Sequence, residues 1–138
     1  HLRFAGDDDT RVAAIGRAAA SGADVALISR GGYGLTRILP ALPYKALAKA
    51  IEKGTRFVGL SDFTALQLGL LAKTGATSWA GPALGEDFGP EAEPDEIMLA
   101  CFDDLVSGSA EGTGWTLPAA DARAHEAKPK RHVHDALL

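Results

Sequence analysis

Cysteine and long apolar runs are scarce in this chain, and each scarcity excludes a class of protein. Its 138 residues include one cysteine, Cys101, so no internal disulfide can form, and the paired Cys/His spacings of zinc sites are absent. The longest strongly apolar stretch, around Leu66 to Ala72, is far shorter than the roughly 20 residues that span a bilayer. We therefore expect neither a disulfide-stabilised nor a membrane-spanning protein, and no cofactor or metal.

Positive charge is also in short supply, with 14 Lys and Arg against 18 Asp and Glu and a formal net charge of -4. Because the chain lacks a strongly positive surface charge, nucleic acid and anionic membrane surfaces are not expected as main partners, and a small molecule is favoured. The 46% hydrophobic and 23% charged residues are typical of globular rather than disordered proteins. At this length one compact domain is expected.

Strand and helix signals alternate along the chain. Short apolar runs at 25–28 and 57–60 are typical of buried strands in a parallel sheet, and 77–80 can form a third strand. The other expected elements are helices at 7–20, 35–39, 44–53, 61–73 and about 94–105, an acidic loop at 86–94 and an edge strand at 115–117. In the helix at 61–73 we expect one apolar face, formed by Phe63, Leu66, Leu70 and Leu71.

This order of elements predicts an α/β fold with a mainly parallel sheet and helices on both faces, Rossmann-like or flavodoxin-like, and incomplete at both ends. We assign residues 1–118 to a partial N-terminal α/β domain and residues 119–138, rich in alanine and charge, to a linker. Ligands of such a fold are expected beyond the carboxyl ends of the strands. Two motifs are predicted to lie there.

The first motif places Ser61 between an apolar run and an amphipathic helix, which is the arrangement of a nucleophile elbow. Such a turn exposes the serine hydroxyl above the sheet and aims the next residue's N–H at the developing oxyanion. Gly59 supplies the small residue two places earlier and Asp62 the N–H, although Phe63 departs from G-x-S-x-G. The alternative is that Ser61 only caps the helix and Asp62 is a first-turn acid.

The second motif is the glycine loop Arg30-Gly31-Gly32-Tyr33-Gly34, which follows the first buried strand. We therefore expect it at the same sheet edge as Ser61. Glycine permits the close approach that a second oxyanion donor needs, and Gly32 is our candidate. Arg30, Gly31 and Tyr33 are candidates for substrate binding. A simple flexible turn and a phosphate cradle stay open, although the loop fits neither G-x-G-x-x-G nor the P-loop.

Three segments in order, RFAGDDDTR, ISRGGYGLTRILPAL and FVGLSDFTALQLGLLAKTGATSWAGP, resemble the LD-carboxypeptidase family, which includes microcin-immunity peptidases. The resemblance implies that Ser61 is the nucleophile and that the main-chain N–H groups of Asp62 and Gly32 bind the oxyanion. It also implies a following C-terminal domain, absent here, that opens with Gly-Gly-Asn-Leu and supplies a Glu and a His to complete a Ser-His-Glu triad. Ala80 stands where many relatives have His or Gly, so this sequence departs from the family there.

The resemblance further implies a cytoplasmic enzyme of peptidoglycan recycling that releases terminal D-Ala from murein tetrapeptide. A microcin-type acyl-sulfamoyl substrate and a homodimer stay open. The chain's own histidines are terminal or in the charged tail, so we expect none to serve as the base of Ser61 and expect the chain alone to be inactive. The alternative function is a catalytically silent module that holds a carboxylate or phosphate at the glycine loop and helix N-terminus.

Overall fold

The structure is a computed structural model that describes residues 4–89, 91 and 93–109. In this part of the chain, three short strands form one sheet in the order β1 (Val25–Leu27), β2 (Arg56–Gly59) and β3 (Trp79–Ala80). Both pairs of neighbouring strands run parallel, so all three strands end at the same edge of the sheet. The predicted parallel sheet is confirmed.

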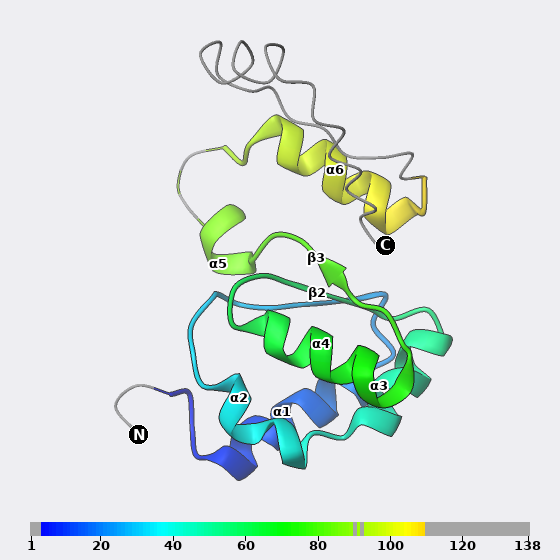
Figure 1. Ribbon diagram of the computed structural model, residues 1–138. Coiled ribbons are helices and arrows are strands. Elements are labelled where there is room, and N and C mark those ends of the chain that lie inside the picture. Colours follow the sequence, from blue (N-terminus) through cyan, green and yellow to red (C-terminus); the bar gives the residue numbers. More distant parts are fainter. Residues whose placement is uncertain (1–3, 90, 92, 110–138) are drawn as a thin grey trace, which may run out of the picture.

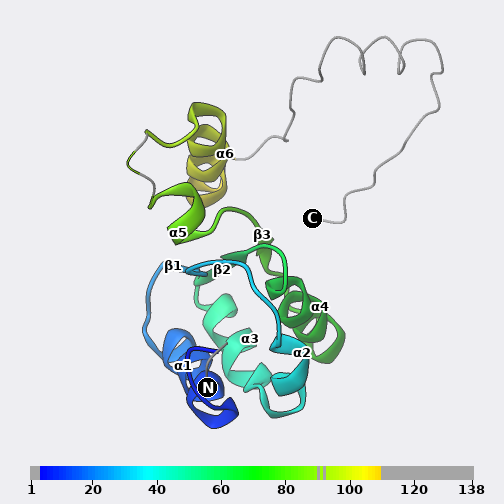
Figure 2. The same cartoon turned by 90° about the vertical axis from the view of Figure 1, so that its left-hand side faces the viewer.

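The helices lie on two sides of this sheet (Figures 1 and 2). One side carries α1 (Asp8–Ala20), α2 (Leu35–Ile38), the 3-10 turn η1 (Leu39–Ala41), α3 (Tyr44–Glu52) and α4 (Phe63–Thr74), and the other carries α5 (Leu84–Asp87) and α6 (Glu96–Ser107). Phe88 and Phe102 pack with ring centroids 5.6 Å apart, which joins α6 to the end of α5. The predicted α/β class with helices on both faces is confirmed.

The main core lies between the sheet and the larger helical layer. Its buried residues are Ile38, Leu42, Leu47, Ala50, Phe57, Leu66 and Leu70. Because side chains alternate along a strand, Phe57 of β2 joins this core while the fully buried Val58 contributes to the opposite face. The strand that leads to Ser61 is therefore fixed by packing on both of its faces.

The ends of the helices follow the signals in the sequence. The Asp7 carboxylate accepts a hydrogen bond from the Thr10 N–H at 2.8 Å and begins α1, and Asp95 caps α6 through the Met98 N–H at 2.8 Å. Gly75 ends α4 with φ 72. None of the helices in the described residues has the length and hydropathy of a membrane span.

The predicted apolar face of α4 is wrong in one position. Leu66 and Leu70 are buried, but Leu71 is 49% exposed. Consecutive helix residues are about 100° apart around the axis, so Leu71 turns away from the stripe that Leu70 shares with Phe63.

The region after β2 shows two further differences from the sequence predictions. The expected strand at 77–80 is reduced to Trp79–Ala80, and part of the expected acidic loop is α5 (Leu84–Asp87). This four-residue helix is stabilised by the Asp87 carboxylate, which accepts a hydrogen bond from the Ala83 N–H at 2.7 Å. The predicted edge strand at 115–117 and the linker at 119–138 lie outside the described residues.

Candidate active site

Ser61 lies in a sharp turn between β2, which ends at Gly59, and α4, which begins at Phe63. Its φ of 59 is the one positive value found for a non-glycine residue in the described part of the chain, and its side chain is exposed. The turn places Asp62, not Ser61, at the N-cap of α4. The predicted strand-turn-helix geometry is therefore confirmed, and the alternative in which Ser61 is the helix cap is wrong.

Gly59 leaves no room for a side chain beneath this turn. A Cβ at this position would lie 2.6 Å from Phe63 Cδ1 and 2.8 Å from Ile28 Cγ2, closer than non-bonded carbon atoms approach each other in proteins. The small residue two places before the serine is thus a steric requirement of the fold. It allows α4 to start directly above the end of β2.

The positive φ of Ser61 gives a testable effect on stability. A side chain in the left-handed region costs about 1–2 kcal/mol, which glycine does not pay. We expect Ser61→Gly to be more stable than Ser61→Ala by about 1 kcal/mol, because alanine keeps the strained backbone and glycine relieves it. Urea denaturation of both variants measures the difference.

The control for this comparison is Ala14→Gly, at an exposed position inside α1. There glycine should lower stability by about 0.5–1 kcal/mol, because glycine inside a helix is less stable than alanine. If Ser61→Ala were as stable as Ser61→Gly, the strain assigned to this turn would not exist.

The glycine loop that follows β1 lies against the serine. A Cβ at Gly31 would lie 3.1 Å from Ser61 Cβ and 3.3 Å from Ser61 Oγ, so these two residues are in direct contact. The two motifs predicted to meet at the carboxyl edge of the sheet do so. A Cβ at Gly32 would have no heavy atom within 4 Å, so this residue borders open space. The oxyanion role of the Gly32 and Asp62 N–H groups stays a prediction.

The far end of the glycine loop packs on Phe4. Gly34 has φ 104, and a Cβ there would lie 2.5 Å from Phe4 Cε1, so only glycine fits. The Phe4 and Tyr33 rings lie with centroids 5.3 Å apart, although Tyr33 remains 59% exposed. A contact of Phe4 with this loop was not predicted, and the only sign of it in the sequence is the place of Phe4 in the segment RFAG.

Arg30 and Tyr33 are both accessible at this edge of the sheet. The Arg30 Nε donates a hydrogen bond to the Gly31 carbonyl at 2.9 Å, which turns the guanidinium back along its own loop. Both side chains are exposed and able to meet a ligand. Substrate binding by Arg30, Gly31 and Tyr33 stays a prediction.

The segment after β3 crosses the same edge toward β1, which the sequence did not reveal. The Leu84 N–H donates to the Ile28 carbonyl at 2.8 Å, and the Gly85 N–H donates to the Ser29 carbonyl at 2.7 Å. These bonds attach α5 to the start of the glycine loop. The edge that carries Ser61 is therefore fixed by elements that follow all three strands.

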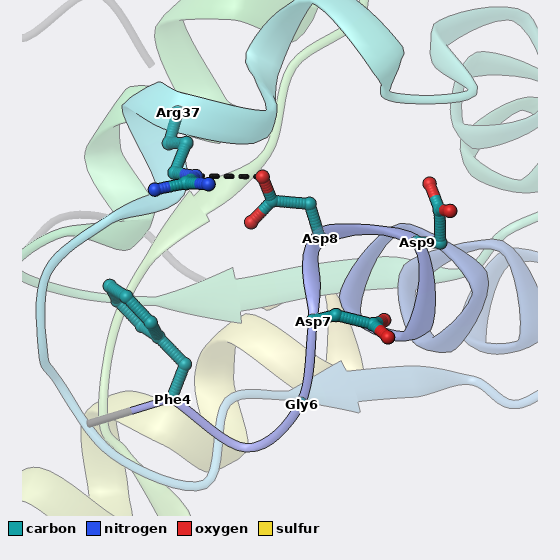
Figure 3. Close-up of a pocket in the computed structure, with 6 residues that line it drawn as sticks. All are labelled: Phe4, Gly6, Asp7, Asp8, Asp9 and Arg37. Atoms are coloured by element: carbon teal, nitrogen blue, oxygen red, sulfur yellow. Dashed lines mark hydrogen bonds and ion pairs between the residues drawn. The ribbon is translucent and has the colours of Figure 1, made fainter. Parts of the chain in front are cut away.

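A separate hollow of ≈ 550 Å³ lies at the start of α1 and is drawn in Figure 3. It is lined by Phe4, Gly6, Asp7, Asp8, Asp9 and Arg37. The Arg37 Nε donates to Asp8 Oδ2 at 2.7 Å, and this bond raises the pKa of Arg37 above its ordinary value. Two hydrogen bonds lower the pKa of Asp7. The larger effect comes from the Thr10 side chain and the smaller one from the Thr10 backbone N–H. Ser61 does not line this hollow, and two of its acids have partners elsewhere, because Asp7 caps α1 and Asp8 pairs with Arg37.

The described residues include no histidine, because all four lie at positions 1, 125, 132 and 134. The expected base of Ser61 is therefore not among the residues that form this site. The site as described consists of an exposed serine on a strained turn, a glycine loop in contact with it and the N-terminus of α4.

Known proteins resemble this chain over the whole segment that contains these elements. Residues 1–81 match the LD-carboxypeptidase N-terminal domain, a segment that contains both loops. The crystal structure of muramoyltetrapeptide carboxypeptidase from Oxalobacter formigenes is similar with a TM-score of 0.67 and 39% identity, over 76% of this chain and 34% of that one.

A second group of similar proteins is represented by the microcin C7 self-immunity protein MccF. The Escherichia coli protein is 35% identical over 89 residues, which are 64% of this chain and 25% of the relative. A structure of MccF in complex with aspartyl sulfamoyl adenosine has a TM-score of 0.62 and 25% identity, over 82% of this chain and 33% of that one.

The chain spans about a quarter of the length of the curated relatives that it matches, between 24% and 26% in three of them. The domain match nevertheless covers more than half of the chain and includes β1, β2, the glycine loop and Ser61. The resemblance seen in the sequence is confirmed, and the chain belongs to the LD-carboxypeptidase family, whose N-terminal domain it matches over residues 1–81.

Proposed function

We propose that this chain carries the nucleophile of a serine LD-carboxypeptidase, which releases terminal D-Ala from murein tetrapeptide during peptidoglycan recycling in the cytoplasm. The observation that carries the proposal is the exposed Ser61, held at φ 59 between β2 and α4 with Gly31 against its hydroxyl. Strained backbone of this kind is concentrated at active sites. Membership of the family supports the same reaction class.

In this reaction the Ser61 Oγ attacks the carbonyl carbon of the L,D amide, and the carbonyl oxygen becomes an oxyanion. The N–H groups of Asp62 and Gly32 donate hydrogen bonds to that oxyanion, and the N-terminus of α4 adds a partial positive charge. Collapse of the tetrahedral intermediate expels D-Ala and leaves an acyl-enzyme on Ser61. Water then hydrolyses the ester and regenerates the serine.

A serine hydroxyl needs an adjacent base for this attack, because it is a weak nucleophile at its ordinary pKa. We propose that a histidine, oriented by a glutamate, comes from a C-terminal domain that follows this chain. The histidine accepts the Ser61 proton and later donates it to the leaving amine of D-Ala.

A second candidate substrate is an acyl-sulfamoyl nucleoside of the microcin type. It is supported by the similarity to MccF, which has been solved in complex with aspartyl sulfamoyl adenosine. The chemistry at Ser61 is the same acyl transfer, and the two substrates differ in the acyl group and the leaving group that the site must bind. A silent binding module is less favoured, since holding an anion on backbone N–H groups requires no strained serine.

We expect the complete protein that contains this chain to release D-Ala from murein tetrapeptide, measured by chromatography of the free amino acid. The matched control is the same peptide ending in L-Ala, which should stay intact. Hydrolysis of aspartyl sulfamoyl adenosine without D-Ala release would assign the microcin-type function instead. If the protein hydrolysed neither compound, the proposed enzyme function would be wrong.

A further inference from the structure

The carboxylate of Asp62 forms a long-range hydrogen bond. Its Oδ2 accepts the N–H of Leu35 at 2.8 Å, across 27 positions of the chain and in a half-buried setting. Leu35 is the first residue of α2, and the residue before it, Gly34, has no side chain that could cap this helix. Asp62 therefore caps α2 from a different part of the fold.

This use of the carboxylate is unusual for its position. Asp62 is the N-cap residue of α4, where an aspartate normally accepts an N–H from the first turn of its own helix. Its backbone is instead helical, with φ -60 and ψ -24, and its side chain makes no capping bond to α4. The carboxylate is thus bonded to the first residue of α2, directly after the glycine loop, and not to the helix that it precedes.

The pair Ser61-Asp62 consequently contacts both ends of the glycine loop. Gly31 at the start of the loop touches Ser61, and Leu35 just after its end is bonded to Asp62. Beyond Leu35, α2 is anchored in the core through Ile38, which is 2% exposed. The middle of the loop is open, because Gly32 faces open space and Tyr33 is exposed, although Tyr33 and Gly34 also pack on Phe4.

We propose that the Asp62 carboxylate is a positioning residue that holds the glycine loop against the nucleophile turn, so that the loop backbone and Ser61 face one reacting carbonyl. The bond suits this task because an ionised acceptor makes hydrogen bonds roughly twice as strong as a neutral one. The catalytic part of this inference rests on the proposed function. The structural part, the restraint of the loop by Asp62, is independent of it.

The kinetic test uses the complete protein and D-Ala release from murein tetrapeptide. Asp62→Ala removes the acceptor and leaves the Asp62 backbone N–H in place, and we expect kcat to fall about 100-fold, the cost of misplacing a site by about 1 Å. KM should change little, so kcat and kcat/KM fall together. Asp62→Asn keeps a neutral oxygen that can accept the Leu35 N–H, and should stay within about tenfold of the wild-type kcat.

The matched control is Asp95→Ala, which removes the same kind of bond, a carboxylate to a backbone N–H at 2.8 Å, from the start of α6. It should lower thermal stability without changing kcat at a temperature where the protein is folded. If Asp62→Ala behaved in the same way, Asp62 would be a helix cap with no catalytic consequence. Equal losses of kcat in Asp62→Ala and Asp62→Asn would also overturn the proposal, because Asn keeps an acceptor for the Leu35 N–H and Ala does not.

Hydrogen exchange tests the restraint without any substrate. In Asp62→Ala the Leu35 amide, which donates to Asp62, and the Arg37 amide, which donates to the Gly34 carbonyl at the end of the loop, should exchange at least tenfold faster than in wild type, while those of α6 stay protected. Unchanged exchange of the Arg37 amide would overturn the restraint. If the wild-type protein released no D-Ala but the loop exchanged faster in Asp62→Ala, the proposed function would fail and the restraint by Asp62 would stand.

Discussion

Replacing Ser61 by alanine in the complete protein is expected to lower the kcat for D-Ala release by about a millionfold. In the proposed mechanism the Ser61 Oγ forms the acyl-enzyme. Alanine removes this atom and leaves the backbone strain unchanged, because both residues carry a Cβ at φ 59. The turn should therefore keep its shape and the oxyanion donors should stay in place. What remains is the smaller acceleration that binding and the oxyanion hole supply without a nucleophile.

The measurement is single-turnover D-Ala release, together with binding of murein tetrapeptide by calorimetry. Ser61→Ala should bind the peptide within a few-fold of wild type, which separates loss of chemistry from loss of the site. Ser107→Ala, an exposed serine at the end of α6, is the matched control and should keep full activity. Full activity in Ser61→Ala would remove the nucleophile assignment and with it the proposed mechanism.

The sequence was sufficient to predict the strand-turn-helix at Ser61 because each part of it is specified locally. The apolar run that forms β2, the apolar residues at helical spacing in α4 and the terminating Gly75 are all signals within a few residues. The meeting of Ser61 with the glycine loop also followed from the sequence, since parallel strands end at one edge. These rules give the location of a site but not its contacts.

The contacts that hold the site depend on distant partners, which a local pattern cannot specify. The bond from the Leu35 N–H to Asp62 joins residues 27 positions apart, and an aspartate before a helix is ordinarily interpreted as the cap of that helix. The attachment of α5 to Ile28 and Ser29 is equally non-local. Its only trace in the sequence is Gly85, where a Cβ would lie 2.8 Å from the Ser29 carbonyl oxygen.

The error at Leu71 has a different origin. A run of leucines in α4 offers more apolar residues than the buried stripe of one helix can hold, and the sequence does not say which of them face the core. In the structure the stripe is centred on Leu66 and Leu70, and Leu68 and Leu71 remain exposed. The sequence therefore predicted that α4 buries an apolar stripe, but not which of its leucines belong to it.

The 138-residue chain by itself is expected to release no measurable D-Ala, although it contains Ser61 and the glycine loop. A serine without a base is a poor nucleophile, and loss of triad function in serine hydrolases costs about a millionfold in turnover. The described residues include no histidine, and the proposed base belongs to a further domain. The assay compares the chain, the complete protein and the complete protein with Ser61→Ala at equal concentration.

Circular dichroism and cooperative urea unfolding of the isolated chain provide the control, because only a folded chain tests the chemistry. If the folded chain releases D-Ala no faster than the complete protein with Ser61→Ala, the result agrees with a base that a further domain supplies. Adding the remaining part of the protein as a separate polypeptide should then restore D-Ala release, and the restored rate should depend on its concentration. Activity in the folded chain alone would contradict this account. It would mean that a histidine at position 1, 125, 132 or 134, or a different base, reaches Ser61.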